Sequence, residues 1–160
     1  MNAIKLLMEQ HREVEQLFEK LEQGGADKQQ AFEDLADALA VHTAIEEKLF
    51  YPATKTARTE DLLLEAVEEH LGAKRLLADM LNADVEDQAF DAKIKVLKEQ
   101  VEHHVKEEEV ELFPKVSELF SEQSLEELGL RLTELAADVR EGVAEPREMV
   151  PEETDAPAPI

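Results

Sequence analysis

The stretch His42-Thr-Ala-Ile-Glu46-Glu47-Lys-Leu-Phe-Tyr51-Pro52 places a histidine four residues before a glutamate and then ends at an aromatic residue and a proline. The same pattern returns as His104-Val-Lys-Glu-Glu108-Glu109-Val-Glu-Leu-Phe113-Pro114, with each matched position 62 residues further along the chain. Residues four apart lie one above the other on an α-helix. Each His–Glu pair can therefore bind one metal ion together, or let the carboxylate reach a second ion.

Apolar residues recur every three or four positions along four segments, which predicts four amphipathic helices. We expect these helices at about 2–23, from Asp27 to a break at Pro52, at about 60–81, and at about 87–113 before a break at Pro114. The apolar stripes carry one histidine each, which are His11, His42, His70 and His104 in chain order. The two halves therefore resemble each other as helical hairpins, and together they predict a four-helix bundle with pseudo-twofold symmetry.

The remainder of the chain is expected to lie outside this bundle. A capping-box match at Ser124 to Glu127 predicts one more helix over 123–142. Residues 143–160 contain four of the six prolines and several acids, so we expect an acidic, proline-rich disordered tail there. The predicted protein is all-α, with the bundle domain over 1–122.

Composition excludes several classes of partner and site. The formal net charge is −22, so nucleic acid and anionic membranes are poor partners, because both require basic patches. The chain has no cysteine, which excludes disulfides, thiolate metal sites and iron–sulfur clusters and is compatible with a reducing compartment. We find no apolar run long enough for a membrane span and no signal peptide, and we expect a cytoplasmic protein.

Six polar residues share the apolar faces of the four helices, and together they suggest a metal site: His11, His42, Glu46, His70, His104 and Glu108. A single histidine on an apolar face is often only a hydrogen-bonded core residue, but a buried glutamate needs a cation or hydrogen-bond partners. Imidazole and carboxylate donors without sulfur favour Fe, Mn, Zn, Co or Cu over Ca or Mg. Four histidines and two bridging carboxylates can hold two ions. A ferritin-type site is disfavoured, because no histidine follows an acid by three residues.

The ordered pattern H…HxxxE…H…HxxxE, with its EE-x-LFYP and EE-xx-LFP endings, resembles the hemerythrin-like proteins of the HHE cation-binding family over about residues 3–116. The resemblance implies an up-and-down antiparallel four-helix bundle. It also implies a non-haem centre of two Fe ions, bridged by an oxo or hydroxo group, for which Zn or Mn are substitutes.

One position departs from the oxygen-carrying members of that family, which have a second histidine four residues after the one on the third helix. Here the position is Lys74, and a protonated lysine is no ligand. The chain therefore resembles the short-motif branch, which implies a small-molecule partner such as peroxide, O₂ or NO, and a catalase-like or oxidative-stress role. The alternatives are a non-enzymatic O₂, NO or iron binding or sensing module and a metal-free structural bundle. Lys74 itself is expected to pair with a core carboxylate, to lose its proton if it is fully buried, or to donate a hydrogen bond beside the centre.

Tyr51 is the only tyrosine, and two interpretations of it stay open. It lies nine residues after His42, which is the opposite side of an ideal helix and favours a packing role. Pro52 follows it and can distort the backbone locally, and some short-motif relatives carry a tyrosine here, so Tyr51 is also a candidate ligand. His103 is expected to be exposed or outside the ligand set. Glu47 and its repeat counterpart Glu109 are expected to be solvated or to contact the ligands from outside.

Overall fold

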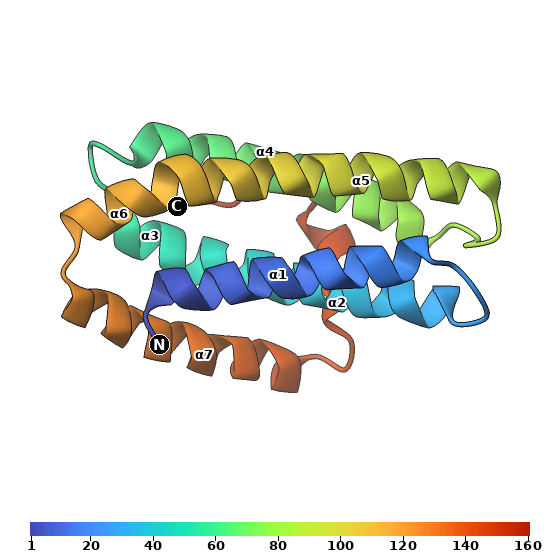
Figure 1. Cartoon of the computed structure of the whole chain (residues 1–160), viewed down its shortest axis with the longest axis horizontal. Coiled ribbons are helices and arrows are strands. Elements are labelled where there is room, and N and C mark those ends of the chain that lie inside the picture. The colour runs from blue at the N-terminus through green and yellow to red at the C-terminus, as the bar shows by residue number, and fades with distance from the viewer.

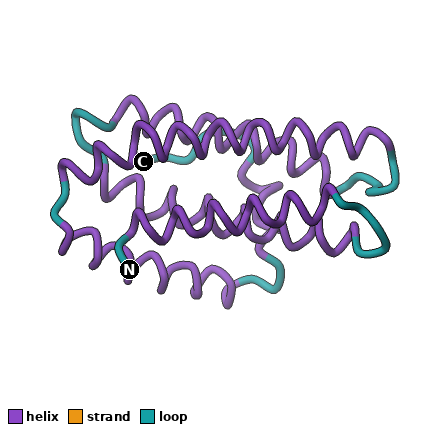
Figure 2. The backbone as a smooth tube through the Cα atoms, viewed as in Figure 1, coloured by secondary structure: helices purple, strands orange, loops and turns teal.

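The computed structural model describes all residues, 1–160, and consists of helices without strands (Figures 1 and 2). Four long helices form the bundle: α1 (Ala3–Glu22), α2 (Lys28–Ile45), α4 (Glu60–Leu81) and α5 (Gln88–Glu107). α1 packs on α2 and α4 packs on α5, so the two expected hairpins are present. In Figure 1 the α1/α2 pair lies below the α4/α5 pair, with all four helices nearly parallel to the long axis. The predicted all-α bundle is confirmed.

Local sequence signals set the ends of these helices. The Asn2 side chain accepts a hydrogen bond from the Lys5 N–H and caps α1, and Asp87 caps α5 by accepting from the Ala89 N–H. Gly24 and Gly25 have φ angles of 70° and 100°, a left-handed conformation that glycine adopts without strain. The two glycines therefore let the chain reverse between α1 and α2.

Regular α-helix is disrupted just before both prolines, as the sequence predicted, but neither proline ends the helical course of the chain. α2 continues through a π-helical turn, η1 (Glu46–Phe50), into α3 (Tyr51–Thr54), and α5 continues through η2 (Glu108–Leu112) into α6 (Phe113–Leu119). In each π-turn the residue before the proline donates its N–H to the glutamate five residues earlier. The break in regular α-helical bonding thus falls where proline has no N–H to donate.

The apolar core has two parts, one toward each end of the bundle. One part gathers around Leu7, Ile45, Phe50 and Phe113, and the other gathers around the edge-to-face pair Phe32 and Phe90, whose ring centroids are 5.0 Å apart. The six inward-facing polar residues of the repeats lie between these two parts. Burial of apolar surface at both ends therefore holds a polar layer in the middle.

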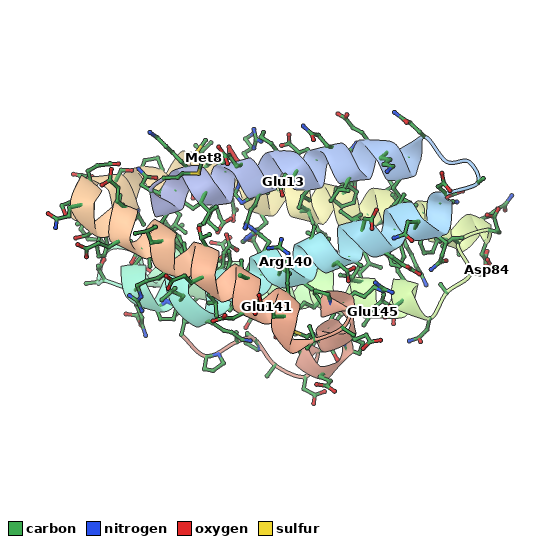
Figure 3. The ribbon with its side chains drawn as sticks, turned by 90° about the horizontal axis from the view of Figure 1, so that it is seen from below. Met8, Glu13, Asp84, Arg140, Glu141 and Glu145 are labelled. Atoms are coloured by element: carbon green, nitrogen blue, oxygen red, sulfur yellow. The ribbon has the colours of Figure 1, made fainter.

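A further helix, α7 (Glu122–Gly142), packs on the outer side of α1 and α2. Its N-cap is Ser121, whose side chain accepts from the Ser124 N–H, so the helix begins slightly earlier than the capping box at Ser124 predicted. The start of the chain lies against it, with the Asn2 side-chain amide donating to the Glu122 carboxylate at 2.9 Å. Seen from below in Figure 3, Glu145 marks the connection that follows α7.

Residues 143–160 differ from the predicted disordered tail. Pro146–Glu153 form a 3₁₀ helix, η3, which packs on α2 and α4 and lies behind the two helix pairs in Figure 1. The side chain of Val150 is buried in the second part of the core, with 1% of its surface exposed. Burial of the valine side chain and the paired charges thus offset the entropy cost of ordering this segment. Its proline-rich, acidic composition had suggested that this cost would prevail.

None of the helices has the length and the apolar character needed to cross a membrane.

Two helical glycines test this packing directly. A Cβ atom added at Gly129 of α7 would lie 2.2 Å from the Met1 carbonyl oxygen, whereas one added at Gly72 of α4 would meet nothing within 4 Å. We expect Gly129→Ala to lower the free energy of unfolding by about 1–3 kcal/mol, because the N-terminal backbone must move away from α7. Gly72→Ala, the matched control, should raise it by up to about 1 kcal/mol. Denaturant unfolding measures both, and equal effects would contradict the close approach.

Candidate metal centre

The structure brings together all six residues that the repeats singled out. His11 comes from α1, and His42 with Glu46 from the junction of α2 and η1. The His11 Nε2 lies 3.2 Å from Glu108 Oε1, and the His42 Nε2 lies 3.1 Å from Glu46 Oε1. The first hairpin therefore directs two imidazole nitrogens at carboxylate oxygens in the middle of the bundle.

The second hairpin repeats this arrangement. The His70 Nε2 lies 3.0 Å from Glu46 Oε2, and the His104 Nε2 lies 3.3 Å from Glu108 Oε1. Glu46 thus faces one histidine of each hairpin with its two oxygens, and Glu108 faces one of each with Oε1. The two glutamates lie between the histidine pairs, which is the position that bridging ligands require.

The Nδ1 atoms of His11 and His70 are held by the glutamates that follow the repeated pairs. Glu109 Oε2 is 2.9 Å from the His11 Nδ1, and Glu47 Oε2 is 2.9 Å from the His70 Nδ1. This is the outside contact that the sequence suggested for Glu47 and Glu109. An Nδ1–H bonded to a carboxylate leaves Nε2 with its lone pair directed inward, as a metal ligand requires.

Two further side chains hold the other pair of histidines, and the sequence reasoning missed them. The Gln10 side-chain oxygen is 2.7 Å from the His42 Nδ1, and Glu69 Oε1 is 2.9 Å from the His104 Nδ1. Both residues come immediately before a histidine of the neighbouring helix, Gln10 before His11 and Glu69 before His70. Gln10 and Glu69 thus occupy matched positions in the two repeats, and this match is the sequence signal that could have identified them.

Four atoms at the centre are buried without a hydrogen bond: His11 Nε2, His42 Nε2, Glu46 Oε1 and Glu108 Oε1. Each nitrogen lies 3.1–3.2 Å from one of the oxygens, but these contacts lack hydrogen-bond geometry. Buried polar atoms without partners cost free energy, and they are rare in folded proteins. These four residues each offer one ligand atom within 4.8 Å of the others, and Glu46, His70 and His104 form a second group that meets the same limit. Two nitrogens with two carboxylate oxygens suit a transition-metal or zinc ion, so the residues fit the cation that their arrangement implies.

Tyr51 lies at the centre, because the π-turn changes its direction. Its hydroxyl is 2.9 Å from Glu46 Oε2 and 2.7 Å from Glu108 Oε2, and it lies 3.2 Å and 3.4 Å from the Nε2 atoms of His70 and His104. In a π-turn residue i+5 is placed above residue i, so Tyr51 lies above Glu46 and not on the opposite face. The geometric objection to Tyr51 as a ligand is therefore removed.

Charge at the centre is strongly coupled. Burial and the Glu46 carboxylate each raise the pKa of Glu108. His104 and His11 lower it by more, so that the pKa of Glu108 lies at about 2. Burial lowers the pKa of His104, yet the Glu108 carboxylate holds it well above its usual range. Burial, Glu108 and Glu46 all raise the pKa of the Tyr51 phenol well above 10. Two carboxylates in this centre thus require positive charge beside them.

Lys74 is buried and pairs with a carboxylate, which is one of the roles expected for it from the sequence. Its Nζ is 2.6 Å from Glu47 Oε1 and 3.3 Å from Glu153 Oε2 in η3. Glu47 in turn bonds His70, so Lys74 positions that histidine indirectly. The symmetry-related contacts have the same order across the two hairpins, since Arg12 bonds Glu109 and Glu109 bonds His11.

His103 lies outside the centre, as expected, with 65% of its side chain exposed. It forms contacts with Glu69 at 3.3 Å and with Glu107 at 3.0 Å. The one-residue offset from His104 therefore separates a surface histidine from one that faces the core.

Comparison with known proteins supports the same conclusion. The family model of the Hemerythrin HHE cation binding domain matches residues 2–116, whereas a comparison with curated proteins gives no significant match. Among solved structures, the chain is similar to a Hemerythrin HHE cation binding domain-containing protein, an Rv2633c homolog from Mycobacterium kansasii, with a TM-score of 0.76 and 25% identity. The match covers 92% of this chain and 98% of that one. The chain therefore belongs to the hemerythrin HHE cation-binding family.

Proposed function

We propose that this protein binds two iron ions between its helical hairpins and reacts there with hydrogen peroxide or O₂. The observation that carries the proposal is the set of four buried, unpartnered nitrogen and oxygen atoms, which a cation would satisfy. A metal-free structural bundle would leave these atoms facing one another as His–Glu ion pairs, without hydrogen bonds. His11 and His42 would hold one ion, His70 and His104 the other, and Glu46 and Glu108 would bridge them.

Tyr51 is proposed as a seventh ligand, on the side of His70 and His104. Its hydroxyl lies 3.2 Å and 3.4 Å from those two nitrogens, and it contacts one oxygen of each glutamate. Binding as a phenolate would require Tyr51 to lose the proton that it donates to Glu108, so a bound cation would have to offset the raised pKa of the phenol. The ion beside His11 and His42 would have no equivalent donor, because the matched repeat position is Phe113, whose ring stacks on His11 with centroids 5.9 Å apart.

The space beside the centre fits a very small reactant. A cavity of about 40 Å³ is lined by all four histidines, together with apolar residues such as Val14, Leu77 and Val101. A single water needs roughly 10–15 Å³ of such space, so the cavity admits O₂, NO or hydrogen peroxide and no large organic substrate. Lys74 also lines it and is positioned to donate a hydrogen bond to a peroxide oxygen.

The proposed reaction is disproportionation, in which two molecules of hydrogen peroxide give one O₂ and two waters. Bound iron would supply the electron transfer and an open coordination position. The protein would keep the histidines in one tautomer through Glu47, Glu69, Glu109 and Gln10, and would hold the reactant in the apolar cavity. The apolar lining suits uncharged O₂ or NO equally well, so reversible binding without turnover is the second candidate.

Adjacent histidines provide a matched pair of variants. We expect the native chain to bind about two iron ions, since both hairpins offer a histidine pair and share the glutamates. His104→Ala should lose at least one ion and most peroxide consumption, whereas His103→Ala, the control, should keep both. Iron quantification and O₂ release from hydrogen peroxide measure the two properties. Equal iron content in the two variants would contradict the assignment, and full iron content without O₂ release would favour reversible binding.

Tyr51→Phe tests the seventh ligand. Phenylalanine occupies the matched position in the other repeat, so the substitution should leave the fold intact. We expect the iron-loaded variant to keep its metal but lose the phenolate-to-iron absorption band of the native protein. A native spectrum without this band, or an unchanged spectrum in the variant, would show that Tyr51 only packs beside the site.

The pH dependence of stability should reverse when metal binds. In protein stripped of metal, the raised pKa values of His11, His70 and His104 add stability below 6.5 that is lost as the pH rises through those values. The lowered pKa of Glu108 adds stability above 4.5 that is lost as the pH falls toward about 2.

Stripped protein should therefore be most stable between about 4.5 and 6.5 and less stable above that window. Metal-loaded protein should become more stable from pH 5 to about 8, because metal binds neutral histidine. Denaturant unfolding across this range measures both curves. Parallel curves would indicate that the histidines do not bind the metal.

A further inference from the structure

The duplication creates two equivalent grooves beside the centre. Because α1 corresponds to α4 and α2 to α5, the groove between α1 and α5 is matched by the groove between α4 and α2. The first groove is open, and its walls include His11, Val14, Val101 and Val105, which also line the inner cavity. The second groove is filled by η3, which contacts both α2 and α4.

η3 is fastened to the bundle by charged residues at both of its ends. The Arg147 backbone N–H and guanidinium donate to the Asp37 carboxylate at 2.9 Å and 3.0 Å, and the guanidinium also meets Glu33 at 3.4 Å. At the other end Glu153 meets the buried Lys74. Between these anchors the Val150 side chain forms part of the wall of the cavity that the four histidines line.

We propose that Val150 is a specificity-determining residue: with η3 it closes the α2/α4 side, so that only molecules as small as O₂, NO or hydrogen peroxide reach the centre, through the α1/α5 groove. The substrate class rests on the proposed function, but the closure does not. Bulky organic hydroperoxides are excluded because the cavity of about 40 Å³ has no room for an alkyl group beside the histidines. Removing the Val150 side chain or its anchor should connect the cavity to solvent on a second side.

The chain contains an intrinsic fluorescent residue that can report which molecules reach the centre. It has one tyrosine and no tryptophan, and that tyrosine is Tyr51, which is fully buried at the centre. The fluorescence lifetime of metal-free full-length protein therefore reports which molecules reach the centre. Dissolved O₂ should shorten the lifetime of native protein, whereas acrylamide, which is larger, should shorten it little.

Val150→Ala and Arg147→Ala should each raise the acrylamide quenching constant several-fold and leave O₂ quenching nearly unchanged. Val96→Ala is the control, because Val96 is 45% exposed on α5 and lines neither groove nor cavity. Val101→Ala, on the open side, should raise acrylamide quenching as well. Quenching by acrylamide that is already high in native protein, or unchanged in both Val150→Ala and Arg147→Ala, would overturn the closure. Circular dichroism melting shows whether each variant stays folded at the assay temperature.

The same variants, loaded with iron, test the substrate class separately. Native protein should consume hydrogen peroxide but not tert-butyl hydroperoxide, and Val150→Ala should gain consumption of the second. If quenching responds as expected but no peroxide is consumed, the closure stands and the proposed reaction fails. If native protein consumes both peroxides at similar rates, the selectivity is wrong.

Discussion

Two glutamates, Glu46 and Glu108, are buried side by side in the middle of the bundle, with 0% and 2% of their surfaces exposed. Isolated buried carboxylates would be strongly destabilising, and two together repel each other. Four histidines, one from each long helix, surround them and supply the compensating charge or the metal ligands. The apolar clusters at either end stabilise the bundle around this polar layer.

The sequence duplication makes the two sides of the centre similar, and a few residues depart from that symmetry. Two symmetry-related sets of contacts follow the order cation, glutamate, histidine, and in each the glutamate comes from the opposite half: Lys74–Glu47–His70 and Arg12–Glu109–His11. The aromatic at the end of each repeat differs, since Tyr51 brings a hydroxyl to the centre where Phe113 brings only a ring. The two proposed ions would thus have unlike surroundings.

Sequence periodicity sufficed to predict the four helices, their pairing and the six polar residues that meet, because each signal repeats at helical spacing. The place of Tyr51 was not predictable in this way. Its direction depends on a π-turn, and a period of 3.6 residues assigns it to the wrong face. Pro52 and Pro114 marked both π-turns, but their sequence signal resembles that of a helix end.

The C-terminal segment was misjudged for a different reason. Its prolines and acids are typical of disorder, and composition does not reveal that Val150, Arg147 and Glu153 meet partners on α2 and α4. Such long-range contacts are set by the groove between two helices, which exists only after the bundle has formed. The same holds for Gln10 and Glu69, whose imidazole partners lie on neighbouring helices.

The place of the metal can be located by anomalous diffraction at the iron absorption edge from crystals of iron-loaded protein. We expect two anomalous peaks between the hairpins, one beside His11 and His42 and the other beside His70 and His104, with Glu46 and Glu108 between them. The absence of a peak there, or a peak only at the surface group of Glu69, His103 and Glu107, would contradict this expectation.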